Sequence, residues 1–102
     1  MAALDLNYPG ADLIRDGLDD WRRGIESVPA LLVQVGAPRH RHLGIDMPTV
    51  AVDSPEHRLY ALLAADTPDS AHGRYNALIR RLVSFERAVA RGNASAFRDG
   101  TA

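Results

Sequence analysis

Apolar residues recur at alternating spacings of four and three between positions 71 and 89, which is the clearest pattern in the chain. The series consists of Ala71, Tyr75, Leu78, Leu82, Phe85 and Val89. At roughly 100° per residue, these positions lie within an arc of about 80° on a helix. Because Gly92 closes the pattern, it predicts a helix of about 24 residues, or ~36 Å. A folded chain of this size is about 34 Å across, so the stripe forms either the core or part of an interface.

A second amphipathic pattern predicts a helix over residues 10–23. Its apolar positions, spaced by four, three and four, are Ile14, Leu18, Trp21 and Ile25. Gly17 lies beside this seam, where the missing side chain would let another helix approach closely. Gly24 is a plausible stop.

The segment between Ser27 and Gly36 would be apolar on nearly every side of a helix, which is typical of a buried helix. Ser27 can cap this helix and Pro29 falls in its first turn. Gly36 is predicted to end it, and Pro38 to open a short third helix that reaches Leu43. The β-branched residues of the segment leave a buried strand as the alternative.

Two further helices follow a connector over residues 45–52 that contains a proline. Asp53, with Pro55 and Glu56 behind it, predicts a capped start for a helix that runs to about residue 65. Leu59, Leu62 and Leu63 are expected to face inward on it. A similar Thr-Pro-Asp start precedes the long C-terminal helix. The predicted fold is therefore all-α: one small domain, residues 1–92, as a bundle of four to five helices, with residues 93–102 as a frayed tail.

The composition is typical of a globular protein, since 46% of the 102 residues are hydrophobic and 25% are charged. No apolar run approaches the ~18 residues of a membrane helix, so we expect no membrane partner. The absence of cysteine excludes disulfides and thiolate chemistry, and is compatible with the cytoplasmic location we expect. The net charge is only −1, but residues 72–98 carry six arginines and one acid, so +5. The C-terminal helix is therefore basic, while the preceding segments are mostly acidic.

Candidate chemistry is sparse. The run Arg39-His40-Arg41-His42 contains a His-x-His pair, which binds a metal when the backbone is extended. In the predicted helix its two rings point about 160° apart. A row of polar residues at i,i+4 spacing is typical of an ordinary solvated helix face; it consists of His72, Asn76 and Arg80. Because no nucleophile, phosphate-loop or metalloprotease motif is present, we expect a non-enzymatic protein without cofactor or metal.

Residues 28–43 resemble a helix-turn-helix, with a capped helix, a turn at residues 35–37 and Arg39, His40, Arg41 and His42 on a short recognition helix. Leu32 and His42 depart from the pattern, because the motif wants a small residue at the first position and an apolar one at the second. A DNA-binding regulator is thus the alternative function. No family resemblance extends over the whole chain.

The favoured interpretation is a small regulatory or protein-interaction module that contacts another protein or a second copy of itself as a two-fold dimer. The predicted contact residues follow the two apolar seams, with arginines as charged flanks. They are Trp21, Tyr75, Leu82, Phe85 and Val89, together with Arg80 and Arg87.

Overall fold

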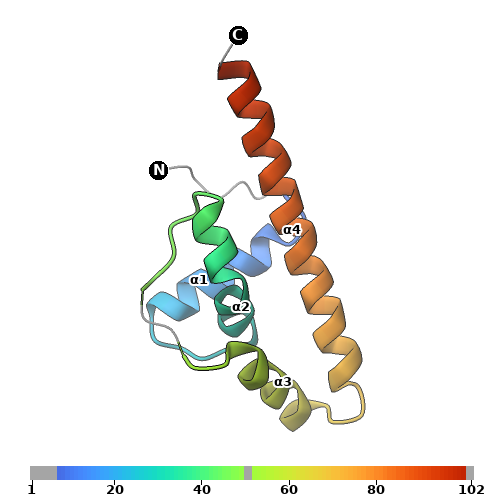
Figure 1. Ribbon diagram of the computed structural model, residues 1–102. Helices are drawn as coiled ribbons and strands as arrows, with labels where there is room; N and C mark the ends of the chain where they lie inside the picture. Colours follow the sequence, from blue (N-terminus) through green and yellow to red (C-terminus); the bar gives the residue numbers. More distant parts are fainter. Residues whose placement is uncertain (1–6, 50–51, 101–102) are drawn as a thin grey trace.

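The computed structural model describes residues 7–49 and 52–100, and in these residues it contains four helices and no strand (Figure 1). The helices are α1 (Ala11–Arg22), α2 (Val28–His42), α3 (Pro55–Asp66) and α4 (Ala71–Gly100). The chain is therefore a small all-α bundle, as the hydrophobic periodicity predicts. α2 packs against each of the other three helices, and α3 also packs against α4.

α2 occupies the centre because it is apolar on every side. Ala30, Leu31, Leu32 and Val33 are fully buried in its first half. Ser27 caps the helix as predicted, with its Oγ accepting a hydrogen bond from the Ala30 N–H at 3.2 Å. These contacts explain the near-uniform hydrophobicity of the segment, and the strand alternative is wrong.

The predicted break in α2 is also wrong. The helix continues through Gly36 and Pro38 to His42, so there is no turn at residues 35–37 and no separate helix from Pro38 to Leu43. A proline inside a helix removes one i→i−4 hydrogen bond, and a glycine lowers helix propensity. Packing of α2 against the other three helices outweighs both local penalties.

α1 crosses α2 at very short range. A Cβ built on Gly17 would overlap the carbonyl oxygen of Pro29 and a methyl group of Val33. The prediction that Gly17 allows a close helix approach is therefore confirmed. Ile14, Leu18 and Trp21 are buried as their spacing predicts. Ile25 instead lies beyond the end of α1 and is 41% exposed, so its place in the seam is a wrong prediction.

α3 begins after Ser54, which has a φ of 50° and makes no side-chain capping bond. The expected cap at Asp53 is therefore wrong by one residue. Leu59 and Leu63 are fully buried, whereas Leu62 is 37% exposed and does not face inward.

α4 is longer than the periodicity indicates. It spans thirty residues, or about 45 Å at 1.5 Å per residue, and the molecule is 52 Å in its longest dimension. Gly92 does not end it, and the backbone of the expected frayed tail is helical as far as Gly100. The Tyr8 hydroxyl fills the space that a Cβ on Gly92 would need. Figure 1 shows the C-terminal end of α4 extending beyond the other helices.

None of the helices in the described residues is long and apolar enough to cross a lipid bilayer.

Candidate interaction groove between α2 and α4

The junction of α2 and α4 is held by one nearly buried carboxylate. Glu86, in the middle of α4, lies 2.9 Å from His40 Nε2 through its Oε2 and accepts from Arg39 Nε at 3.0 Å through its Oε1. Its side chain is only 11% exposed. Gly36 makes room for the pair, because a Cβ there would lie 2.6 Å from His40 Nε2 and 2.8 Å from Glu86 Oε2. A glycine on α2 thus allows a buried polar contact between the two helices.

His40 is completely enclosed. Desolvation by burial lowers its pKa below the ordinary value, although the neighbouring Glu86 carboxylate acts in the opposite direction. A neutral ring that donates its Nε2 proton to Glu86 leaves Nδ1 as an acceptor, and this atom has no hydrogen-bond partner among the described residues. The ring also packs edge-on against Phe85, with the centroids 5.6 Å apart. Because His40 has no exposed surface, it forms a buried contact between α2 and α4.

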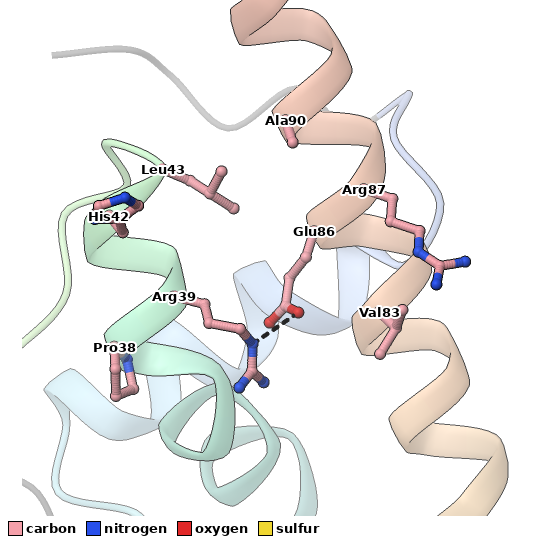
Figure 2. Close-up of a pocket in the computed structure, with 8 residues that line it drawn as sticks. All are labelled: Pro38, Arg39, His42, Leu43, Val83, Glu86, Arg87 and Ala90. Carbon is pink, nitrogen blue, oxygen red and sulfur yellow. Dashed lines mark hydrogen bonds and ion pairs between the residues drawn. The ribbon is translucent and has the colours of Figure 1, made fainter.

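An open groove of about 570 Å³ lies beside this buried contact, between the C-terminal half of α2 and the middle of α4 (Figure 2). Its apolar lining comes from Pro38 and Leu43 on the α2 side and from Val83 and Ala90 on α4. The remaining lining residues are Arg39, His42, Glu86 and Arg87. In Figure 2 the side chain of Leu43 extends toward α4, and the Arg39–Glu86 ion pair bridges the two helices. A volume of this size lies in the range of protein binding sites.

A row of arginines runs along α4 beside the groove. Arg80, Arg87 and Arg91 lie within about 40° of each other at ~100° per residue, and all three are exposed. In the described part of the chain none of them has an ion-pair or hydrogen-bond partner. Arg74 and Arg81, by contrast, pair with Asp66 and Asp12. We call Arg80, Arg87 and Arg91 the basic row.

Arg39 adds a further cation to this surface. Only its Nε bonds to Glu86, its side chain is 55% exposed, and its two terminal nitrogens have no partner among the described residues. The groove therefore offers an apolar floor with guanidinium groups on both of its walls.

The contact residues predicted from the apolar seams lie mainly in the core of a single chain. Leu82 and Phe85 are at most 1% exposed, and Trp21 and Val89 are also buried. Tyr75 is half-buried, with its ring 5.7 Å from that of Tyr60. The choice between core and interface for the middle of the α4 stripe is thus decided in favour of the core. The two charged flanks, Arg80 and Arg87, are exposed and belong to the basic row.

The four residues of the DNA-binding alternative do not form a common surface. His40 is enclosed, Arg39 pairs with Glu86, and Arg41 donates from Nη2 to the carbonyl oxygen of Pro48 at 2.6 Å. His42 is exposed and lines the groove. With no turn inside α2, the helix-turn-helix geometry on which the alternative was based is a wrong prediction.

Sequence reasoning missed Glu86 and the burial of His40. One signal was present, because Glu86 is the only acid between residues 72 and 98 and directly follows Phe85 of the apolar stripe. A lone acid at the edge of a buried stripe in a basic helix indicates a specific hydrogen-bond partner. The partner itself was hidden, because the predicted break at Gly36 separated His40 from the core helix.

Among the described residues no three His, Asp or Glu side chains are grouped so that they could hold a metal ion. The chain matches no protein-family model, and no similar protein was found among curated sequences or solved structures.

Proposed function

We propose that this chain is a small non-enzymatic interaction module that binds a helical segment of another polypeptide in the groove between α2 and α4. The observation that carries this proposal is the apolar floor, formed by Pro38, Leu43, Val83 and Ala90, beside the unpaired basic row. Amphipathic helices are commonly recognised in this way, with apolar anchors in a groove and charges at its rim. The matching ligand is a helix with apolar side chains and flanking acids.

The chemistry of the groove favours a polypeptide over a phosphate backbone. Three arginines can neutralise only about three phosphates, which is few for tight binding to nucleic acid at physiological salt. Apolar floor residues have no counterpart on a phosphate backbone, whereas Leu, Phe or Tyr side chains of a helix would remove them from water. The exposed terminal nitrogens of Arg39 and the free Arg87 suit carboxylates, which guanidinium groups bind in a bidentate manner.

The groove is also well supported from within. Glu86 joins α4 to α2 through two bonds, and Asn93 Nδ2 donates to the carbonyl oxygen of Leu43 at 2.9 Å further along the same junction. A surface that is already in its binding conformation loses less conformational entropy when a partner docks.

A matched pair of substitutions on α4 tests the proposal. Ala90 lines the groove and Ala77 does not, and both are exposed alanines of the same helix. Purified wild-type chain, Ala90→Glu and Ala77→Glu would be cross-linked in a lysate of cells that produce the protein. We expect at least one protein to be captured by wild type and Ala77→Glu but not by Ala90→Glu. Identical capture by all three chains would overturn the proposal.

A further inference from the structure

The outer face of α3 is a largely exposed helix face, on which apolar residues lie beside His57 and Arg58. Within its own chain it is covered only in part, because Arg58 pairs with Glu26 and the Tyr60 ring packs against Tyr75. Eight of its twelve residues are apolar, but only Leu59 and Leu63 are buried. Tyr60 and Leu62 are 39% and 37% exposed and are among the largest exposed hydrophobic side chains of the described residues. Two exposed alanines, Ala61 and Ala65, lie between them on the face turned away from the core.

Acidic residues border this face at both ends of the helix. Asp53 and Glu56 lie at its start and Asp69 follows its end, and all three are exposed. None of them has an ion-pair partner in the described residues, whereas Asp66 is held by Arg74. Residues 53–69 contain four acids and one arginine, so their net charge is −3. We call α3 together with these flanking acids the acidic helix.

The acidic helix and the groove match in charge and length. The basic row extends over twelve residues from Arg80 to Arg91, or about 18 Å at 1.5 Å per residue. α3 has twelve residues, which corresponds to ~18 Å. One surface has apolar side chains between unpaired acids, and the other has apolar side chains beside unpaired arginines. The unpaired charges of the two surfaces are therefore complementary.

The two surfaces cannot meet within one molecule. α3 packs beside the beginning of α4, where Tyr60 contacts Tyr75. The groove is formed further along, from Val83 to Ala90. These residues follow Tyr75 by eight and fifteen positions, which corresponds to about 12 and 22 Å of helix. Figure 1 shows α3 near the N-terminal end of α4, whereas the C-terminal end of α2 lies beside a later part of it.

We propose that the acidic helix of a second copy of this chain occupies the α2–α4 groove, and that the exchange is reciprocal. The inference rests on the proposed function, since it identifies the helix that the groove binds. A two-fold arrangement uses each groove and each acidic helix once, so it closes as a dimer and leaves neither surface free. It also forms the helix-in-groove contact twice, which brings the interface nearer to the roughly 1,600 Å² of a stable complex.

Charge reversal in two separate chains tests this assignment. The first variant carries Arg80→Glu and Arg87→Glu, and the second carries Glu56→Arg and Asp69→Arg. All four side chains are exposed, so thermal melting by circular dichroism at low concentration should show both variants folded. Arg23→Glu, at an exposed position after α1, serves as the control for a charge reversal outside both surfaces.

Light scattering at ~100 µM, well above a micromolar dissociation constant, is expected to give a dimer mass for wild type and for Arg23→Glu. Each reversal variant alone is expected to give a monomer mass. An equimolar mixture of the two variants should regain the dimer mass, because the groove of each is then complementary to the acidic helix of the other. A monomeric wild type, reversal variants that remain dimeric, or a mixture that stays monomeric would each overturn the inference.

The lysate experiment separates this inference from the proposed function. Capture of a different protein that is lost in Ala90→Glu, together with a monomeric wild type, would reject the second copy as the partner and retain the groove. Both proposals would be rejected if capture from the lysate were the same with Ala90→Glu as with wild type and the charge reversals left the mass in light scattering unchanged.

Discussion

Replacing Gly36 with alanine should destabilise the protein, although the same change stabilises most helices. A Cβ at this position would lie 2.6 Å from His40 Nε2 and 2.8 Å from Glu86 Oε2. Neither side chain can easily retreat, because His40 is enclosed and Glu86 is bonded on both oxygens. Overpacking typically costs ~1–3 kcal/mol, and a buried hydrogen bond left broken costs about 1–3 kcal/mol.

The helix-propensity gain of alanine over glycine, ~1 kcal/mol, offsets part of this cost. The net destabilisation is therefore expected to be about 1–5 kcal/mol. At ~4–8 °C per kcal/mol for a chain of this size, the melting temperature should fall by roughly 5 °C or more. Gly73→Ala is the matched control, because Gly73 is helical and has nothing within 4 Å of an added Cβ. It should leave the melting temperature unchanged or raise it.

Thermal melting followed by circular dichroism at a fixed low concentration measures both effects. If Gly36→Ala were as stable as Gly73→Ala, the close packing of α2 against the Glu86 pair would be refuted. A Glu86→Ala background adds a second check, since the coupling between contacting sites should make the cost of Gly36→Ala smaller there. An unchanged cost would mean that the strain arises elsewhere.

Two further predictions concern burial and protonation. Leu82→Ala, at a side chain 1% exposed, should cost about 2–5 kcal/mol, whereas Leu62→Ala, at a side chain 37% exposed, should cost much less. Equal losses in urea titrations would contradict the burial of Leu82 in α4 and the exposure of Leu62 on α3. Burial lowers the pKa of His40 in the folded chain. Below the ordinary histidine pKa of about 6.5, the unfolded chain therefore binds more protons at this residue than the folded chain does. The free energy of unfolding should consequently fall as the pH drops from 7.5 to 5.5. The urea midpoint should lose this dependence in His40→Gln and keep it in His42→Gln; the same pH profile in both variants would show that another group titrates.

The sequence predicts those parts of the fold that depend on periodicity and on local capping. The stripe on α4 identifies its buried face, and the space beside Gly17 is confirmed by its overlap with Pro29 and Val33. Ser27 caps α2 as expected. In each case a short stretch of sequence contains the physical cause.

Predictions failed where tertiary packing overrules a local rule. Gly36 and Pro38 indicate a break, but α2 contacts three helices and gains more from continuing. Gly92 indicates an end to α4, but its missing Cβ accommodates the Tyr8 hydroxyl. The Glu86–His40 contact joins residues 46 positions apart, and no pattern along the chain reveals a pair at that separation. The candidate groove could not be predicted for the same reason, since one of its walls is the uninterrupted α2.

Amide chemical shifts recorded while the protein is diluted from ~1 mM to ~10 µM, on both sides of a micromolar dissociation constant, test most directly that the α2–α4 groove binds the acidic helix of a second copy. The account predicts shifts at both of its surfaces, in residues 38–43 and 83–91 of the groove and in residues 56–66 of α3. It predicts little change along α1. Spectra that do not depend on concentration, or shifts confined to residues outside these segments, would contradict it.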